Sequence, residues 1–363
     1  MSAALAPVPE NPREAQHLYD AFAIGTEIDD AISLVIATSG STGTPKGSQH
    51  TPATLAASAR ATAEYLGGEG NWLLALPPHH IAGLQVLLRA LAAGHNPAVL
   101  DLSDGFDPLA FADALEHLDG PRRYTSLVPT QLVKVLDTPR ACAALASIDA
   151  LLVGGAATPP TLLQKALDAG IPIVRTYGMS ETAGGCVYDG TSLDGVHITL
   201  ADANPDGVGR VQLTGPMVAH GYRLLPEHPA FVTGGRELHE AENTFRTDDL
   251  GRLDDGILTI IGRADEAISS GGLMIVPQVV EGVIATDPSV IECAVIGVAD
   301  HRLGEKVVAV IVGTEHVDPQ RIKDLVADRL DRYAAPRDVI IVDALPTRGP
   351  GKIDRRALRE QFG

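Results

Sequence analysis

Residues 33–50, with the sequence SLVIATSGSTGTPKGSQH, place an apolar run directly before a loop of glycine and hydroxyl residues. The run at 34–37 is rich in branched aliphatic residues and predicts a buried strand. In the following loop, glycines let backbone N–H groups approach an anion, Ser and Thr add donors, and Lys46 adds positive charge. This order predicts a strand that leads into a phosphate-binding loop. The alternative is an ordinary flexible loop of Gly and Ser.

The loop differs from the common phosphate loop, which ends in Gly-Lys followed by Ser or Thr. Here Pro45 precedes Lys46, and Gly47 follows it. We therefore expect a loop that is more mobile than the rigid cradle of that motif. The residues expected to contact phosphate are Thr38, Ser39, Gly40, Ser41, Thr42, Gly43 and Lys46.

Around this loop the chain alternates short apolar runs with helical patterns. The runs that predict buried strands are 32–37, 72–76, 97–100, 149–155 and 171–178. Three predicted helices begin with a capping residue followed by proline, at Thr51-Pro52, Asp107-Pro108 and Thr158-Pro159, and Gly170 is placed to end the third. Alternation of this kind predicts a mainly parallel sheet covered by helices.

The pattern changes from about Gly195, where strands follow one another without helices and Asp255-Gly256 predicts a hairpin turn. A new mixed pattern begins after 262–266, with strands around a helix that is capped at Asp318. The sequence therefore predicts a smaller antiparallel section, a boundary near 262–266, and a further domain after it.

Composition narrows the class of protein. The 363 residues are enough for more than one domain, and a net charge of -18 argues against nucleic acid or an anionic membrane as a partner. The three cysteines lie far apart without CxxC spacing, which predicts buried thiols in a reducing compartment. No apolar run approaches a membrane helix, and the N-terminus does not resemble a secretory signal. These features predict a cytosolic (cytoplasmic) α/β enzyme.

Four further motifs follow the loop, with the sequences RTYGMSETAGG (175–185), FRTDDLGRL (245–253), GRADEAISSGGLMIVPQVVE (262–281) and RGPGKIDRRAL (348–358). Together with the loop they resemble the motifs of the adenylate-forming superfamily, which includes acyl- and aryl-CoA ligases. Five motifs in the family's order, spanning residues 33 to 358, make the resemblance specific. Two positions depart from the pattern, because Ser180 replaces Thr and Asp248 replaces Gly.

The resemblance implies two domains within an α/β fold. A large N-terminal domain of mixed sheets layered with helices, residues 1–263, would bind the adenylate and acyl groups. A small mobile α+β C-terminal domain would comprise residues 264–363. Only about 32 residues precede the first strand, so we expect a reduced N-terminal subdomain and homodimer contacts that compensate for it.

The resemblance also implies a reaction in two steps that uses ATP, Mg²⁺ and coenzyme A. A carboxylic acid first forms an acyl-adenylate and releases pyrophosphate, and the thiol of coenzyme A then displaces AMP. No general base is needed, because carboxyl groups have pKa values near ~4 and are ionised at neutral pH. The protein must supply alignment and charge neutralisation at phosphorus.

The motif residues have implied roles in this reaction. Lys352, Ser180 and Glu181 would be catalytic, and Glu181 would also hold Mg²⁺ through carboxylate oxygen. Lys352 lies in a Gly- and Pro-rich stretch that suits delivery of positive charge to the phosphoryl group. Beyond the loop, the expected ATP- or CoA-binding residues are Gly154, Gly155, Ala156, Tyr177, Gly178, Asp249, Arg263, Gly271 and Gly272, with Asp265 as hinge. The alternative for the binding residues is that they form ordinary turns without a ligand. The alternative for Lys352 is a solvent-exposed lysine near the C-terminus.

The stretch LPPHHIAGLQVLLRALAAGH (76–95) resembles the short o-succinylbenzoate–CoA ligases of menaquinone biosynthesis, particularly the actinobacterial ones. That substrate has two carboxylates, and His80, Gln85 and Arg89 are candidates to contact it. Alternatively, His80 is a hydrogen-bonded histidine at the start of a helix, and the Arg89 side chain extends to the surface. Adjacent histidines usually point to different sides, so we expect no zinc at His79 and His80.

Three functions therefore stay open within this resemblance. The first is an o-succinylbenzoate–CoA ligase, which binds a small-molecule carboxylic acid and has no nucleic-acid or membrane partner. The second is another aryl- or acyl-CoA ligase. The third is a stand-alone adenylation domain that loads a carrier protein.

Overall fold

A computed structural model describes residues 4–38, 45–233, 243–348 and 352–363. The phosphate-loop residues Ser39, Gly40, Ser41, Thr42 and Gly43 lie outside these ranges. The chain forms two compact units. The first comprises Met1–Thr199, Gln212–Thr247 and Asp255–Leu258, and the second comprises Leu200–Val211, Asp248–Asp254 and Thr259–Gly363. The domain boundary expected after residue 263 stays a prediction.

The first unit is built around a seven-stranded sheet with the order β4-β3-β5-β6-β7-β8-β9. Its strands are β3 (Asn71–Leu74), β4 (Ala98–Val99), β5 (Arg123–Leu127), β6 (Ala150–Val153), β7 (Ile173–Met179), β8 (Gly184–Tyr188) and β9 (Thr191–Ser192). Neighbours from β4 to β7 are parallel, whereas β8 and β9 join antiparallel. The predicted mainly parallel sheet is confirmed, and the carboxyl ends of β3, β5 and β6 meet at one edge.

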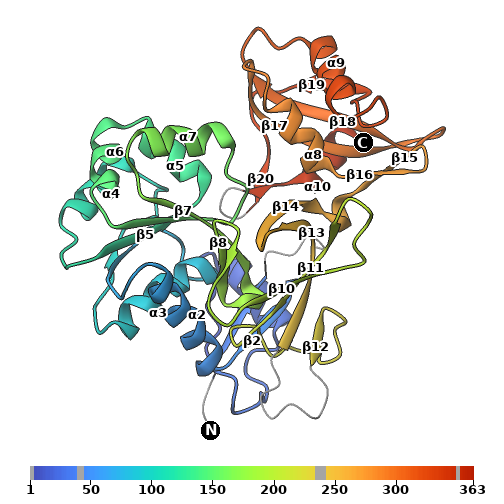
Figure 1. Cartoon of the computed structure of the whole chain (residues 1–363). Coiled ribbons are helices and arrows are strands. Elements are labelled where there is room, and N and C mark those ends of the chain that lie inside the picture. Colours follow the sequence, from blue (N-terminus) through green and yellow to red (C-terminus); the bar gives the residue numbers. More distant parts are fainter. Residues whose placement is uncertain (1–3, 39–44, 234–242, 349–351) are drawn as a thin grey trace. The chain divides into compact units, whose positions relative to one another are not determined.

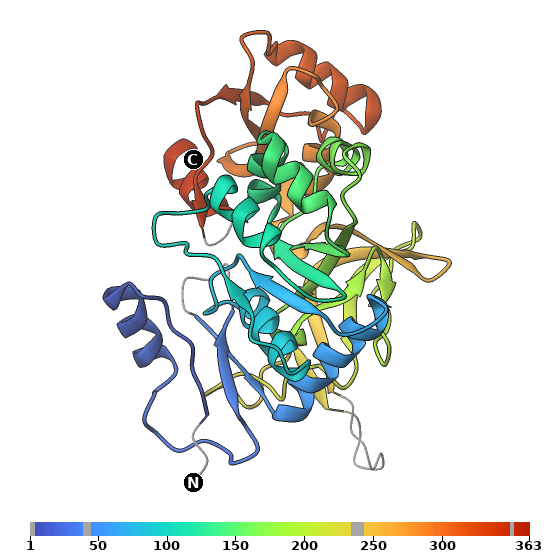
Figure 2. The ribbon, with the colours of Figure 1, turned by 90° about the vertical axis from the view of Figure 1, so that its left-hand side faces the viewer.

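Helices cover both faces of this sheet, as Figures 1 and 2 show. On one face lie α2 (Pro52–Tyr65) and α3 (Ile81–Ala92), and on the other lie α4 (Pro108–Glu116), α5 (Pro129–Leu136), α6 (Pro139–Ala146) and α7 (Pro160–Asp168). Alternate strand residues such as Leu73, Leu151 and Val153 form a core with Phe111 and Leu132 of the second group. The sheet is therefore buried on both sides, as parallel sheets usually are.

Two of the three predicted helix starts are confirmed by their capping bonds. The Thr51 hydroxyl accepts a hydrogen bond from the Thr54 N–H at 3.2 Å, and the Asp107 carboxylate accepts one from the Leu109 N–H at 2.8 Å. Gly170 follows α7 with a φ of +74°, the left-handed conformation in which glycine ends helices. Local sequence therefore sets these helix ends.

The third predicted start is wrong by one residue. Helix α7 begins at Pro160 rather than Pro159, and Pro159 takes the capping position in place of Thr158, with φ -56° and ψ 141°. The residue before a proline is disfavoured in the helical region, so Pro160 keeps Pro159 extended. The second proline of the pair, not the first, therefore opens the helix.

The apolar run at 32–37 forms β1 (Leu34–Ala37), but this strand does not join the parallel sheet. It pairs antiparallel with β2 (Gly47–His50) in a separate two-stranded sheet, from Leu34 opposite His50 to Ala37 opposite Gly47. The sequence of β2, GSQH, has no apolar alternation and did not indicate a strand. Gly47 allows the close packing there, because a Cβ at this position would lie 2.6 Å from Val35 Cγ1.

A five-stranded sheet follows in the chain, with the order β10-β11-β13-β12 and with β14 paired to β13. Its strands are β10 (His197–Ala201), β11 (Val208–Thr214), β12 (Phe231–Thr233), β13 (Asn243–Asp254) and β14 (Ile257–Arg263), and they contribute residues to both units. Asp255 and Gly256 connect β13 to β14 with φ values of +50° and +81°, as a two-residue hairpin turn requires. The predicted turn is confirmed.

The second unit contains another five-stranded sheet, with the order β16-β15-β18-β17 and with β19 parallel to β18. The elements are β15 (Ile268–Ser270), β16 (Leu273–Ile275), β17 (Val290–Asp300), β18 (Gly304–Gly313), β19 (Asp338–Ile341), α8 (Pro277–Ile284), α9 (Pro319–Arg329) and α10 (Arg355–Phe362). Val307, Ala309 and Ile311 pack towards α8 and α9, whereas Val308 and Val310 pack towards α10. Helices therefore cover both faces of this sheet as well (Figure 1).

The three cysteines are free thiols. Burial raises the pKa of Cys186 in β8 to about 12, and burial raises the pKa of Cys293 in β17 to about 12. Cys142 is half-buried in α6 and packs against the sheet core. Within the described ranges, no helix has the length and apolar character needed to cross a membrane.

Candidate active site

The predicted site residues fall on both units, and each unit gathers its own set. The first unit carries Thr38, Lys46, His80, Gln85, Arg89, Gly154, Gly155, Ala156, Tyr177, Gly178, Ser180 and Glu181. The second carries Asp249, Arg263, Asp265, Gly271, Gly272 and Lys352. Among the predicted residues, the first set contains the phosphate-loop lysine and the expected metal ligand.

Glu181 lies in a tight turn, η1 (Ser180–Thr182), which connects β7 to β8. Ala183 ends this turn in the left-handed conformation with a φ of +51°. Its carbonyl accepts two hydrogen bonds, from the Gln85 amide at 2.8 Å and from the Ser58 hydroxyl at 2.9 Å. Helices α2 and α3 therefore hold the turn that presents Glu181.

The Glu181 carboxylate is buried, with 7% of the residue exposed. The Tyr222 hydroxyl donates a hydrogen bond to Glu181 Oε1 at 2.6 Å, and the Ala219 N–H donates to the Glu181 carbonyl at 2.9 Å. A buried carboxylate is tolerated only with such partners, and bonds to ionised acceptors are shorter and stronger than neutral ones. The sequence analysis identified Glu181 but not Tyr222.

Lys46 lies beside the same tyrosine. Its Nζ is 5.1 Å from the centre of the Tyr222 ring and 3.2 Å from His228 Nε2. The Lys46 carbonyl accepts a hydrogen bond from the Thr38 N–H at 2.9 Å, which closes the base of the predicted phosphate loop. The structure therefore brings Thr38, Lys46 and Glu181 into one neighbourhood through Tyr222 and His228.

Both ring nitrogens of His228 face N–H donors. Lys46 Nζ is 3.2 Å from Nε2, and the Ala230 N–H is 3.2 Å from Nδ1. A neutral imidazole accepts at only one nitrogen, so it can satisfy only one of these two donors. The described contacts of the Lys46 ammonium are with His228 and with the ring of Tyr222, and neither carries a carboxylate. An anion such as phosphate would therefore be a stronger partner for Lys46 than His228 is.

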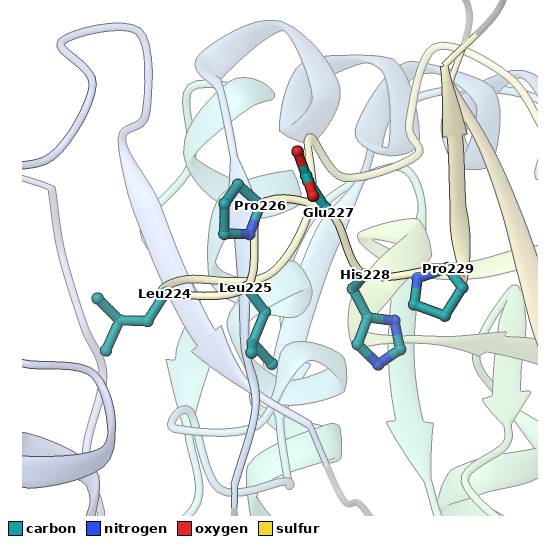
Figure 3. A pocket seen from close by; sticks show the side chains of 6 residues that line it. All are labelled: Leu224, Leu225, Pro226, Glu227, His228 and Pro229. Carbon is teal, nitrogen blue, oxygen red and sulfur yellow. The ribbon is translucent and has the colours of Figure 1, made fainter.

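His228 also lines an open pocket of about 390 Å³, together with Leu224, Leu225, Pro226, Glu227 and Pro229. In Figure 3 the His228 and Leu225 side chains extend to one side of this segment, whereas Glu227 points to the other. The partner of Lys46 is therefore accessible from this pocket.

Ser180 already has partners on both its hydroxyl and its carbonyl. The hydroxyl donates to the Ala37 carbonyl at 2.8 Å, and the Ser180 carbonyl lies 2.7 Å from His50 Nε2, which must donate to it. Burial lowers the pKa of His50 to about 4, against the opposing effect of this hydrogen bond. His50 therefore supports the Glu181 turn as a neutral imidazole, a role the sequence did not indicate. The expected catalytic role of Ser180 stays a prediction.

Tyr177 and Gly178 lie in the last residues of β7, where a register shift interrupts the pairing with β8. A Cβ on Gly178 would lie 2.1 Å from the Gly184 carbonyl oxygen. The sequence analysis placed this glycine among the residues expected to bind ATP or CoA, but the strand next to it already requires a bare backbone. The nucleotide contacts of Tyr177 and Gly178 stay predictions.

Gly154, Gly155 and Ala156 follow β6 at the carboxyl edge of the parallel sheet. A Cβ on Gly154 would lie 2.3 Å from Thr176 Oγ1, and Gly155 has a φ of +81°. Gly155 and Ala156 are exposed. Because ligands bind outside the carboxyl ends of strands in sheets of this kind, their position favours the predicted ligand contact.

His79 and His80 do not point to different sides as expected, because their ring centres lie 4.3 Å apart. The His80 N–H bonds to the Pro77 carbonyl at 3.2 Å, so the chain turns here instead of extending. His80 then caps α3 without a side-chain capping bond. Burial lowers the pKa of His79 from its usual value.

Gln85 and Arg89 are both buried in α3, with 1% and 7% of the residue exposed. Gln85 Oε1 and Arg89 Nε have no hydrogen-bond partner among the described residues. Arg89 Nη2 donates to the Tyr188 hydroxyl at 3.4 Å, and its guanidinium lies 5.4 Å from the Trp72 ring centre. The guanidinium therefore does not reach the surface. Nine residues along a helix, about 13 Å, separate Arg89 from His80, so the structure does not bring these two together.

The second unit gathers Asp249, Arg263 and Asp265. Arg263 forms two hydrogen bonds to Asp265, at 2.9 and 2.8 Å, and its Nη1 lies 3.3 Å from Asp249 Oδ1. Burial disfavours the charged guanidinium and by itself lowers the pKa of Arg263. The carboxylates of Asp265 and Asp249 outweigh this effect and raise the pKa above its usual value. Asp248, which replaces the family's usual Gly, continues β13 and forms an ion pair with Arg210. The expected nucleotide and hinge roles stay predictions.

Gly271 and Gly272 form the two-residue turn between β15 and β16, with φ values of +61° and +83°. Both are exposed, and glycine takes such positive φ values without strain. Lys352 begins β21 (Lys352–Ile353), which pairs with β20 (Thr347–Arg348) directly before α10. The expected CoA and catalytic roles of these residues stay predictions.

Sequence reasoning missed three residues of the first unit, namely Tyr222, His228 and His50. The tyrosine and the histidine at 228 lie about 180 residues from Lys46 in the chain, and no local pattern connects them. Among the described residues, no group of three or more His, Cys, Asp or Glu side chains could hold a metal ion. Glu181 stays the predicted metal ligand, and Mg²⁺ commonly uses one or two carboxylates together with substrate phosphates.

The chain belongs to the AMP-binding enzyme family. The AMP-binding enzyme domain matches residues 7–223, and the AMP-binding enzyme C-terminal domain matches residues 279–352. The chain is 48% identical over 357 residues to a probable 2-succinylbenzoate–CoA ligase of Mycobacterium tuberculosis. This match covers 97% of the chain and 90% of the relative.

Two solved structures are also similar to this chain. MatB from Rhodopseudomonas palustris with bound ATP is 26% identical with a TM-score of 0.81, covering 93% of this chain and 69% of MatB. The o-succinylbenzoate CoA synthetase from Bacillus subtilis, in complex with its acyl-adenylate intermediate, is 28% identical with a TM-score of 0.77. That match covers 91% of this chain and 69% of the synthetase. The predicted family and the mixed α/β fold class are confirmed.

Proposed function

We propose that the protein is an ATP-dependent 2-succinylbenzoate–CoA ligase of menaquinone biosynthesis. The observation that carries this proposal is the 48% identity to a probable 2-succinylbenzoate–CoA ligase, which extends over 97% of this chain and 90% of the relative. Two further relatives at 29% and 30% identity carry the same enzyme name. The proposed co-substrates are ATP with Mg²⁺ and coenzyme A.

In the first step, a carboxylate of the substrate attacks the α-phosphate of ATP, an acyl-adenylate forms, and pyrophosphate leaves. The attacking group is already ionised, so the protein needs to supply positive charge and alignment rather than a base. The buried Glu181 suits a metal that arrives with the nucleotide. When bound, Mg²⁺ would draw negative charge from the phosphate oxygens. Lys46, whose ammonium competes with the Ala230 N–H for the single acceptor nitrogen of His228, would bind phosphate.

In the second step, the thiol of coenzyme A attacks the acyl carbon, and AMP leaves. In this proposal, the change from the first step to the second depends on residues of the second unit. Lys352 serves the first step and is withdrawn for the second, with Asp265 as the hinge and the Gly271-Gly272 turn beside the thiol. Lys352→Ala should therefore lose pyrophosphate release but still convert a pre-made acyl-adenylate with coenzyme A. Equal loss of both steps would contradict this division.

The acid itself is proposed from the relatives and from the edge of the sheet. His80 and the exposed Gly155 and Ala156 all lie at the carboxyl end of the parallel strands, where an aryl acid can approach. Gln85 lies against the turn that carries Glu181. Arg89 lies about 13 Å along α3 from His80, and its contact with the second carboxylate stays part of the proposal.

A second candidate is a ligase for another aromatic acid. The chain is 32% identical to an indoleacetate–CoA ligase and 34% identical to a feruloyl-CoA synthase, which cover 90% and 92% of it. This candidate uses the same two steps and differs only in the acid. No observation favours loading of a carrier protein.

The test is pyrophosphate release from ATP with a panel of acids, followed by AMP release that depends on coenzyme A. We expect 2-succinylbenzoate to give the highest kcat/KM, with indoleacetate and ferulate at least tenfold lower. A higher kcat/KM for one of those acids would favour the second candidate. Pyrophosphate release without thioester formation would overturn the assignment as a CoA ligase.

The proposal also includes a cytoplasmic location and a homodimer. Free thiols and a net charge of -18 suit a reducing compartment without an anionic partner. Light scattering at micromolar concentration should give about twice the chain mass of 37.9 kDa. A mass of one chain would contradict the dimer without affecting the reaction.

A further inference from the structure

Tyr222 contacts both charged residues that the proposed first step uses in this unit. Its hydroxyl donates to Glu181 Oε1 at 2.6 Å, and the face of its ring lies 5.1 Å from Lys46 Nζ. Only 4% of the residue is exposed. One buried side chain therefore connects the predicted metal ligand with the predicted phosphate lysine.

The backbone of Tyr222 is fixed beside the strand that follows Lys46. The Arg223 N–H donates to the Gly47 carbonyl at 2.7 Å, and the Gln49 N–H donates to the Gly221 carbonyl at 3.0 Å. These two bonds flank Tyr222 and tie it to β2, which begins one residue after Lys46. The ring and the ammonium therefore share one rigid support.

The ring of Tyr222 is also fixed from its sides. His228 and Phe231 each pack edge-to-face with it, at centroid distances of 4.8 and 5.0 Å and interplanar angles of 89° and 80°. Phe231 in turn packs against Phe245 at 5.1 Å. Edge-to-face contacts of this kind are directional, so they restrict the ring to one orientation.

We propose that Tyr222 is a positioning residue for the adenylation step. Its hydroxyl fixes the plane of the Glu181 carboxylate before a metal ion arrives, and its ring face holds the Lys46 ammonium close to the phosphate loop. Carboxylates that bind metals are commonly oriented by such hydrogen bonds, and removal of the partner typically costs tenfold to a hundredfold in metal affinity. This inference rests on the proposed function, because it concerns the groups that would bind the phosphates and Mg²⁺.

A purely structural tyrosine in the same unit provides a matched control. Tyr124 is 1% exposed, and its hydroxyl donates to the backbone carbonyls of Leu66 and Gly68 at 3.3 and 3.0 Å. Both tyrosines are buried and hydrogen-bonded, but only Tyr222 donates to a side-chain carboxylate. Tyr124→Phe therefore reports the cost of losing a buried hydroxyl without any effect on Glu181.

The test is calorimetric binding of ATP to the full chain, without acid, in the presence of Mg²⁺ or of a chelator. For Tyr222→Phe we expect unchanged affinity for metal-free ATP and an about tenfold smaller gain in affinity when Mg²⁺ is added. Tyr222→Leu should also bind metal-free ATP about threefold more weakly, because the ring face for Lys46 is lost. Tyr124→Phe should bind as the unchanged protein does in both conditions.

Kinetics provide the second measurement. Tyr222→Phe should raise the Mg²⁺ concentration needed for half-maximal pyrophosphate release, while the conversion of pre-made acyl-adenylate with coenzyme A stays within twofold. An unchanged Mg²⁺ gain in calorimetry, or equal losses for Tyr222→Phe and Tyr124→Phe, would overturn the inference. If the unchanged protein releases no pyrophosphate with any acid, the proposed function fails, and the calorimetry still decides the role of Tyr222.

Discussion

Two glutamates, the buried Glu181 in the first unit and the half-buried Glu281 in the second, differ in the hydrogen bonds that the structure describes. Glu281 in α8 accepts two hydrogen bonds from Arg355, at 2.6 and 2.8 Å, and one from the Val295 N–H at 2.6 Å. Burial raises the pKa of the Glu281 carboxyl, and the Arg355 guanidinium opposes that rise. Glu181 instead accepts a hydrogen bond from the neutral phenol of Tyr222. An arginine cancels the charge of its partner, whereas a phenol orients a carboxylate and leaves its charge in place.

We expect Glu281 to serve the fold, and the catalytic role of Glu181 stays a prediction. Arg355 begins α10, three residues after Lys352, and its Nε is 3.3 Å from Glu266 Oε2, next to the predicted hinge residue. The ion pair therefore ties the segment after Lys352 to α8 and to the chain at residue 266. The following predictions test whether the two glutamates differ in this way.

The largest expected effect is on stability, from Arg355→Met. This change leaves the half-buried Glu281 carboxylate without its cation, and the free energy of unfolding should fall by about 3 kcal/mol. The matched control is Arg356→Met, which removes an exposed pair with Glu360 and should cost less than about 0.5 kcal/mol. Urea unfolding of the full chain measures both. Similar losses for the two variants would show that the pair of Glu281 and Arg355 stabilises the fold no more than an exposed ion pair does.

The next effect depends on pH and concerns the support of Glu181. The pKa of His50 is about 4 in the folded protein, below the ordinary value of 6.5, mainly because of burial. Its contribution to stability is therefore complete above pH 6.5 and is lost as the pH falls from about 6.5 to about 4, by about 3 kcal/mol. Urea midpoints of the unchanged protein and of His50→Gln, compared across this range, measure the loss. Urea midpoints that change with pH in the same way in both proteins would contradict the predicted loss.

Glu181→Gln should separate activity from stability. The amide keeps the shape and can still accept from Tyr222, so the free energy of unfolding should change by less than about 1 kcal/mol. Pyrophosphate release should fall at least about a hundredfold, because the carboxylate charge for the metal is lost. Glu281→Gln is the matched control, with the opposite pattern of lower stability and retained activity per folded molecule. The same pattern in both variants would remove the distinction between the two glutamates.

The smallest expected effect is the loss of a helix-capping side chain, and it should be equal in the two units. Thr51 caps α2 in the first unit, and Asp318 caps α9 in the second through a hydrogen bond from the Gln320 N–H at 2.9 Å. Each change to Ala should reduce the free energy of unfolding by about 1 kcal/mol. Thermal unfolding measures the two losses. A several-fold difference between them would mean that the units differ in general sensitivity and not only at their glutamates.

Local patterns in the sequence predicted those parts of the fold that depend on neighbouring residues. Apolar runs gave the parallel strands, and side-chain oxygens before proline gave the helix starts at Thr51 and Asp107. Strand β2 could not be predicted in this way, since GSQH forms a strand only by pairing with β1 and with the backbone at 221–223. The start of α7 was missed because two consecutive prolines compete for one position.

The same limit applies to the candidate site. Lys46 and Glu181 stand in motifs whose residue types suggest their chemistry, and the structure brings them to one tyrosine. Tyr222 and His228 carry no such local signal, because their importance comes from packing against residues far away in the chain. Arg89 is buried in α3 against Trp72 and Tyr188, and its expected substrate contact stays a prediction.

The burial of the thiols has a practical consequence for fluorescence experiments. Cys186 and Cys293, with pKa values of about 12, should react slowly with maleimide dyes at pH 7, which leaves Cys142 as the one to replace. New cysteines at exposed positions, such as Leu167 in the first unit and Met274 in the second, would then accept a donor and an acceptor dye. Energy transfer between the two dyes would report, in single molecules, whether ATP and coenzyme A favour different arrangements of the units.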